Sequence, residues 1–235
     1  MREDILNKIN YETTRMSTVN IAANYIRNNI ILQKYNEDTS LTEIGMAEEC
    51  GLSRGSIRSA FQILENEGLI RTLDNGRKHV IPFTLKSVAD LYEVRRMLEV
   101  SALQQILGHM NRNDFSDTHL LYMGMASKMK SDDGELVPTE RRVRIDAEFH
   151  RAIIMASGNN ALLQCWSSIE PVIWAMLSIN ATISNKDMHV KQFERHNELV
   201  GRIIRNDPNV ISEVEEHIRI SHLMVEEALI RLNCK

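Results

Sequence analysis

Residues 40–81, SLTEIGMAEECGLSRGSIRSAFQILENEGLIRTLDNGRKHVI, contain two helix signals and a hairpin signal in order. Ser40 and Glu43 form a capping box, which predicts a short helix through Glu49. The residues expected on the inner side of this helix are Leu41, Ile44 and Ala47. After a turn at residues 50–52, Ser53 is the expected N-cap of a second helix. The apolar residues of that helix recur at helical spacing: Ile57, Ala60, Phe61 and Leu64.

Two short strand-like runs, residues 69–72 and 79–81, follow the second helix. Between them, Asp74-Asn75-Gly76 is a strong hairpin signal because Asn and Gly tolerate positive φ. A further amphipathic helix is expected upstream, at residues 19–32. Three small helices followed by a hairpin predict a winged helix-turn-helix domain over residues 1–82, in which residues 1–16 are expected to form a mobile arm.

The remainder, residues 83–235, shows helical patterns and no strand pattern. We expect an antiparallel bundle of about six helices, so that the whole chain is mainly α. The expected helices cover residues 86–110, 113–130, 138–157, 160–183, 187–206 and 210–232.

Composition limits the classes of function. The chain has 235 residues, with 28 Lys and Arg against 32 Asp and Glu, so it is not a polycation. Contact with nucleic acid therefore has to come from a local basic patch. Three widely spaced Cys residues form neither a disulfide framework nor a metal-binding pair, which favours a reducing cytoplasm. No apolar run approaches the length of about 18 residues expected of a membrane-spanning helix.

The second helix of the helix-turn-helix carries the expected DNA contacts, because the first turns of such a helix enter the major groove. Arginine forks suit guanine or phosphate, and serine hydroxyls at a helix N-terminus suit phosphate. Two arginines on a surface helix are commonplace, but their combination with a capped helix, a Gly turn and a basic hairpin favours DNA binding. The candidate residues are Ser53, Arg54, Ser56 and Arg58 on the helix, and Arg77 and Lys78 at the hairpin tip.

A second constellation lies in the helical part. Asp146 and His150 are four residues apart and share a helix face, while His196 and His217 fall on other apolar stripes. Converging inside a bundle, these side chains would bind a divalent transition metal and leave coordination positions open. Each residue alone also suits an ordinary hydrogen-bonded role in a core, and His222 competes with His217 for the fourth position.

Arg95 lies on the apolar stripe of the first bundle helix, among Leu91, Val94, Leu98 and Ala102. A buried arginine needs an anionic partner. That partner is either an internal carboxylate such as Glu99 or the carboxylate of a bound small molecule.

Residues 40–81 resemble the DNA-binding domain of the GntR family of bacterial transcription regulators. The Leu-Ser-Arg turn, the run from Ile57 to Ile70 and the wing follow that family's order. Two positions depart from its pattern, because Ser59 stands where Glu is usual and Lys78 replaces the second Gly of the wing.

Residues 87–232 are similar to the FCD effector domain of the FadR-like branch of that family. The motifs are DLYEVRRMLE (90–99), DAEFHRAIIMASGN (146–159), HNELVGRIIRNDP (196–208) and HIRIS (217–221). The resemblance implies zinc or nickel held by one Asp and three His, with an arginine near the effector. The matching positions are Asp146, His150, His196 and His217 for the metal, and Arg95 for the effector.

The resemblance predicts a cytoplasmic, homodimeric regulator, more often a repressor, which binds a palindromic double-stranded DNA operator under the control of a small carboxylate effector. It does not predict an enzyme. Two alternatives remain open: a metal-dependent hydrolase with an appended DNA-binding domain, and a metal-free DNA-binding module whose helical domain only dimerises.

Overall fold

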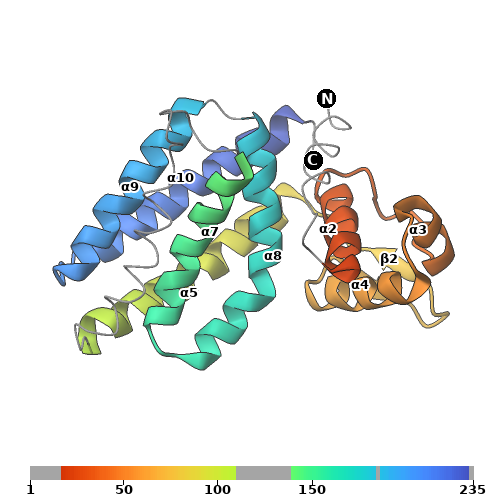
Figure 1. The fold of residues 1–235 in the computed structure, drawn as a ribbon, viewed down its shortest axis with the longest axis horizontal. Coiled ribbons are helices and arrows are strands. Elements are labelled where there is room, and N and C mark those ends of the chain that lie inside the picture. The colour runs from red at the N-terminus through yellow and green to blue at the C-terminus, as the bar shows by residue number, and fades with distance from the viewer. Residues whose placement is uncertain (1–16, 110–138, 184–185, 233–235) are drawn as a thin grey trace. The chain divides into compact units, whose positions relative to one another are not determined.

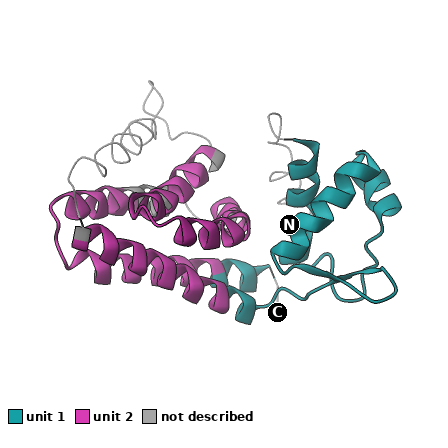
Figure 2. Cartoon of the chain, turned by 90° about the horizontal axis from the view of Figure 1, so that it is seen from below, with its two compact units in different colours: residues 1–88, 226–235 teal, residues 89–225 magenta. Residues whose placement is uncertain are grey.

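The computed structural model describes residues 17–109, 139–183 and 186–232. The chain divides into two compact units (Figure 2). One unit comprises residues 1–88 with residues 226–235, and the other comprises residues 89–225.

The first unit is a winged helix-turn-helix, which confirms the predicted fold class (Figure 1). Helix α2 packs on α4, α3 packs on α4, and the two strands pair antiparallel with Ile70 opposite Val80. Its elements are α2 (Thr18–Ile31), α3 (Glu43–Cys50), α4 (Arg54–Asn66), β1 (Ile70–Thr72) and β2 (Lys78–Val80).

The start of α3 differs from the prediction. Thr42 rather than Ser40 is the N-cap, and its hydroxyl accepts the backbone N–H of Gly45 at 3.0 Å. This shift by two residues rotates the helix, so Met46 is the buried residue and Ile44 is 56% exposed. The expected inward position of Ile44 is therefore wrong.

The start of α4 and the tip of the hairpin follow the predicted local chemistry. Ser53 caps α4 by accepting the backbone N–H of Ser56 at 3.1 Å. In the hairpin, Gly76 adopts a φ of 79°, a conformation that glycine allows at no steric cost. Asn75 contributes through its side chain instead, since its Oδ1 accepts the backbone N–H of Arg77 at 3.0 Å.

The second unit is built from antiparallel helices, as expected. The predicted helix at residues 113–130 lies outside the described residues, and the other five predicted helices are present to within two residues at each end. They are α5 (Leu85–His109), α7 (Thr139–Ala156), α8 (Asn160–Ile183), α9 (Lys186–Ile204) and α10 (Val210–Arg231) (Figure 1).

Two side-chain hydrogen bonds connect α5 and α10. The hydroxyls of Tyr92 and Ser221 lie 3.0 Å apart in a buried hydrogen bond, and Arg96 NH1 donates to Glu215 Oε1 at 2.7 Å. The buried face of α5 contains Arg95, as predicted, but Val94 is 42% exposed. The predicted apolar stripe is therefore rotated, and the observed one includes Val88, Tyr92, Arg95, Glu99 and Ala102.

Helix α8 is long and apolar enough to cross a membrane by length and composition, over Asn160–Thr182. The core helix of a bundle meets the same criteria. Here α8 packs on α7 and carries Glu170, which forms an ion pair with Arg151 of α7. The buried Trp166 and Met176 contribute to the core of the second unit.

Candidate metal centre and nucleic-acid interface

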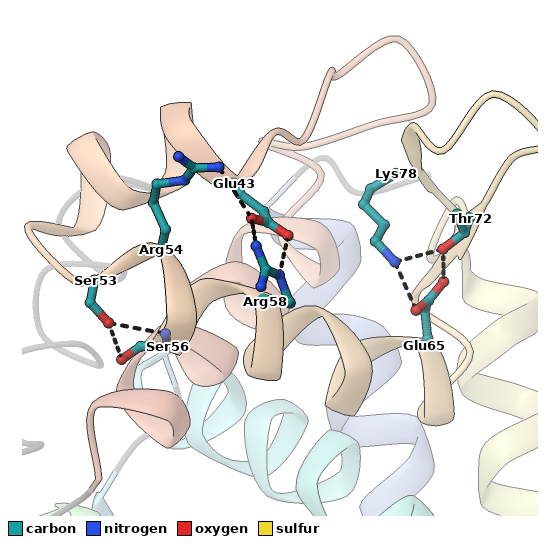
Figure 3. Close-up of polar contacts among 8 residues, drawn as sticks. All are labelled: Glu43, Ser53, Arg54, Ser56, Arg58, Glu65, Thr72 and Lys78. Atoms are coloured by element: carbon teal, nitrogen blue, oxygen red, sulfur yellow. Dashed lines mark hydrogen bonds and ion pairs between the residues drawn. The ribbon is translucent and has the colours of Figure 1, made fainter.

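The two predicted arginines lie in the first two turns of α4 (Figure 3). The side chains of Arg54 and Arg58 are 63% and 61% exposed. Ser53 and Ser56 are joined through their hydroxyls at 2.9 Å, and the Ser56 hydroxyl lies 3.0 Å from that of Thr18. These serine hydroxyls stabilise the start of α4, and a hydroxyl still has acceptor capacity for a further donor.

An acidic residue that the sequence did not single out for this surface lies between the arginines. Arg58 donates from Nε to Glu43 Oε1 at 2.7 Å and from NH2 to Oε2 at 2.8 Å, and Arg54 NH2 is 3.8 Å from the same carboxylate (Figure 3). The hydrogen bonds from Arg58 lower the pKa of the Glu43 carboxyl. The position of Glu43 in the first turn of α3 could have predicted this contact, because a helix-turn-helix brings that turn beside α4.

The two predicted residues of the wing differ in their surroundings. Arg77 is exposed near the hairpin tip. The ammonium group of Lys78 donates to Glu65 Oε2 at 2.9 Å and to Thr72 Oγ1 at 2.6 Å, so it faces the end of α4 (Figure 3). Contact of Lys78 with a phosphate would require these bonds to be exchanged or shared.

The four predicted metal ligands are brought together inside the helical unit. Helix α7 supplies Asp146 and His150, while α9 and α10 supply His196 and His217, and their ligand atoms all lie within 4.8 Å of one another. His217 Nε2 is 2.9 Å from His196 Nε2 and 3.3 Å from His150 Nε2. Asp146 Oδ1 is 3.3 Å from His196 Nε2, and Phe149 stacks on His196 with ring centroids 4.2 Å apart.

The chemistry of these four side chains fits a transition metal. Both carboxylate oxygens of Asp146 are buried, and neither accepts a hydrogen bond from the described residues. Burial raises the pKa of Asp146 to about 6, and burial lowers the pKa of each of the three histidines. Neutral imidazole nitrogens and a buried carboxylate are ligands that suit zinc, and imidazole also suits nickel.

Glu99 connects this cluster to Arg95. Its Oε1 accepts from Arg95 Nε at 2.8 Å, and its Oε2 lies 2.6 Å from His150 Nδ1. The side chains of Arg95 and Glu99 are both 0% exposed. The internal ion pair that the sequence allowed for Arg95 is therefore present, whereas the contact between Glu99 and His150 was missed because it joins residues 51 positions apart.

The remaining nitrogens of Arg95 make no such bond within the part of the chain that the structure describes. NH1 and NH2 are buried and make no hydrogen bond with the described residues, while the guanidinium lies 5.3 Å from the ring centroid of Tyr92. A free guanidinium end suits a carboxylate, which accepts two parallel N–H bonds.

His222 lies outside the four-residue cluster. Its ring stacks on Tyr92 with centroids 5.0 Å apart, so it packs against α5. The geometry therefore favours His217 over His222 as the fourth candidate ligand.

Comparison with known proteins identifies a domain family and a related transcriptional regulator. The family model of the FCD domain matches residues 90–219, more than half of the chain. The chain is 29% identical over 185 residues to the gluconate operon transcriptional repressor of Bacillus licheniformis, covering 77% of this chain and 72% of that protein.

Two solved structures share the fold. The protein Lar of Listeria monocytogenes superposes with a TM-score of 0.61 at 12% identity, covering 92% of this chain and 98% of that one. A transcriptional regulator GntR from Rhodococcus sp. RHA1 superposes with a TM-score of 0.55 at 18% identity, covering 89% of this chain and 98% of that one.

Proposed function

The chain belongs to the GntR family of transcription regulators with an FCD domain, and from this we propose a metal-dependent sensor of small organic acids that controls operator binding. In this proposal, residues 1–82 bind DNA and residues 83–235 bind the effector and form a homodimer. The protein acts in the cytoplasm on double-stranded DNA.

The observation that carries the metal part is the cluster of three imidazole Nε2 atoms beside a buried carboxylate without a hydrogen-bond partner. Asp146, His150, His196 and His217 would hold a divalent transition metal, with zinc or nickel expected. When bound, such a metal supplies a Lewis acid able to bind a carboxylate or hydroxyl oxygen. The chain's own residues supply the remaining recognition of the effector.

Charge supports a carboxylate effector. The charged groups buried at the candidate metal and effector site are the cation of Arg95 and the carboxylates of Glu99 and Asp146, so their net charge is −1. A divalent metal changes this to +1, and a single carboxylate on the effector then neutralises the site. Since uncompensated buried charge is costly, a monocarboxylate is favoured over an uncharged ligand. The free NH1 and NH2 groups of Arg95 are the expected donors to that carboxylate.

The DNA part is supported by the exposed arginines on α4. Arg54 and Arg58 are expected in the major groove, with Ser53 and Ser56 near the phosphates and Arg77 and Lys78 at the wing. A two-fold dimer would present two such helices to a palindromic operator. Repression is the expected sign, and the similar protein of Bacillus licheniformis is named as a repressor.

The effector regulates only if it binds the DNA-competent and DNA-incompetent conformations with different affinities. Gluconate is the first ligand to test, because the name of that relative refers to a gluconate operon. Sorbitol is a matched control, since it is a polyol of the same length without the carboxylate.

The experiment uses the full chain loaded with zinc or nickel and a duplex selected from a random pool by the protein itself. Gluconate is expected to change the affinity for this duplex and to raise the melting temperature. At 100 times its dissociation constant, the stabilisation is about 2.7 kcal/mol. Sorbitol should do neither. Equal DNA affinity with and without each member of a panel of monocarboxylates would contradict the proposed sensing function. Steady hydrolysis of a substrate that stops when a chelator removes the metal would favour the hydrolase alternative.

A further inference from the structure

Glu99 is neither a candidate metal ligand nor a candidate effector contact. It hydrogen-bonds to the candidate effector contact Arg95 and to the candidate metal ligand His150. Its carboxylate is 0% exposed, with Oε1 on Arg95 Nε at 2.8 Å and Oε2 on His150 Nδ1 at 2.6 Å. Both partners are themselves buried, so this arrangement is shielded from water. A carboxylate in this place costs free energy unless both oxygens are well bonded.

We propose that Glu99 is a positioning residue, which fixes His150 in the tautomer that can bind a metal. This inference rests on the metal site of the proposed function. Burial raises the pKa of Glu99, while the charge and the hydrogen bond of Arg95 lower it. With Glu99 ionised in its pair with Arg95, the carboxylate accepts hydrogen bonds and cannot donate them, so the proton of a neutral His150 must sit on Nδ1. The lone pair then lies on Nε2, the nitrogen that faces His217 at 3.3 Å.

Arg95 has a second role in this arrangement, because it holds Glu99 in place. The Nε–H of Arg95 occupies Oε1, which leaves Oε2 for the histidine. The two residues are one helical turn apart on α5, so the helix itself sets the direction of the carboxylate towards α7. Partners of this kind orient a ligating histidine and strengthen its binding of the metal.

The substitution Glu99→Gln tests this role because it keeps size and shape. Glutamine has one oxygen and one NH2 group, so it cannot accept from both Arg95 Nε–H and His150 Nδ1–H. If the NH2 group faces His150, the imidazole proton moves to Nε2 and blocks the ligand position. If the oxygen faces His150, a neutral amide replaces a carboxylate and a weaker hydrogen bond results.

The matched control is Glu215→Gln. Glu215 also accepts from an arginine of α5, since Arg96 Nη1 donates to it at 2.7 Å, and it is not one of the four residues that cluster in the described part of the chain. Zinc affinity is measured for the full chain by competition with a zinc-binding dye. Glu99→Gln should weaken zinc binding by about 10- to 100-fold, and Glu215→Gln should leave it unchanged.

A second measurement needs no change at Glu99. Long-range ¹H–¹⁵N spectra of the metal-free protein labelled at histidine report the tautomer of each ring, and His150 is assigned from its loss in His150→Gln. The expected signal for His150 in the wild type is that of the Nδ1–H tautomer.

An Nε2–H tautomer of His150 in the folded wild type would overturn the inference, and so would wild-type zinc affinity in a folded Glu99→Gln protein. A wild type that binds neither zinc nor nickel would instead contradict the proposed metal site, and the tautomer would still decide the role of Glu99.

Discussion

Arg58 of α4 binds Glu43 of α3 through two hydrogen bonds, from Nε to Oε1 at 2.7 Å and from NH2 to Oε2 at 2.8 Å. Exposed ion pairs of this kind contribute little to stability. We expect a larger effect of this pair on DNA binding, because Glu43 occupies the guanidinium group that the proposed function places against guanine or phosphate. In that proposal, Arg58 has to leave Glu43 or contact both Glu43 and the DNA.

Replacing Glu43 by Gln should strengthen binding to duplexes of any sequence. The substitution frees Arg58 and removes a negative charge close to the expected phosphates. The slope of log affinity against log salt should become steeper by about 1, because one more cation is available to the backbone. Salt titrations of binding to selected and random duplexes measure this. Glu48→Gln, on an exposed position of α3, is the control, and equal salt slopes in both variants would rule the effect out.

Replacing Arg58 by Ala should have the opposite effect and act on specificity. Loss of one guanidinium fork at a base edge costs about 1–3 kcal/mol of discrimination, or roughly 5- to 150-fold. Competition between the selected duplex and a random one measures this ratio. Arg219→Ala removes an equally exposed arginine from α10 and should not change it. An unaltered footprint for Arg58→Ala would count against the role of Arg58.

The double substitution His150→Ala with His196→Ala should abolish bound metal, because it removes two of the four candidate ligands. Elemental analysis of the purified protein, after incubation with zinc and desalting, measures the loss. His222→Ala is the matched control, since His222 stacks on Tyr92 outside the cluster and should leave the metal content unchanged. Undiminished metal in the double variant would remove the proposed site.

Replacing Arg95 by Gln should separate the effector from the metal. The expected result is a strongly reduced gluconate-dependent rise in melting temperature, measured at a zinc concentration that saturates the variant, because loss of the Arg95 bond to Glu99 should also weaken zinc binding. Arg96→Gln, at the neighbouring position, removes the bonds to Glu93 and Glu215 and should preserve the gluconate response. A full response in Arg95→Gln would place the carboxylate elsewhere.

The substitution Asp146→Asn should stabilise the protein in the presence of a chelator. Burial raises the pKa of Asp146 from 3.8 to about 6, so the folded state binds this proton more tightly than the unfolded chain does. Stability is therefore lost as the pH rises from about 4 to 6, by up to about 3 kcal/mol.

Melting temperatures at pH 5 and pH 7.5 test this, with a larger gain for Asp146→Asn expected at pH 7.5. Asp207→Asn is the control, and its effect on the melting temperature should have the opposite sign. The backbone N–H of Asn209 and the side chain of Arg202 lower the pKa of Asp207, so its ionised form stabilises the folded state. A gain of the same size at both pH values would contradict the assigned cause.

Local patterns in the chain were sufficient for most of the fold. The helix that Ser53 caps depends on this hydroxyl and on apolar residues spaced along one face, and α8 covers the predicted residues 160–183. The hairpin depends on a glycine that adopts positive φ at position 76. Such signals act between residues a few positions apart, so they are visible in the sequence.

The errors came where several local signals competed. Ser40 and Thr42 both precede Glu43 and both can cap a helix, and no local signal ranks one above the other. Packing against α4 decides between them, because the start at Thr42 buries Met46 rather than Ile44. The predicted face of α5 was rotated for a related reason: a buried Arg95–Glu99 pair interrupts the apolar pattern that marks a core face.

The composition of the candidate metal site was accessible from spacing and family resemblance, but its surroundings were not. Contacts between Glu99 and His150, or between Glu43 and Arg58, join different helices, and no periodicity along one helix reports which side chain of the next helix will lie opposite. The chain's local chemistry thus specified the helices, the hairpin and the ligand types. Packing of those helices specified which carboxylate meets which cation or imidazole, because that depends on distances between residues far apart in the chain.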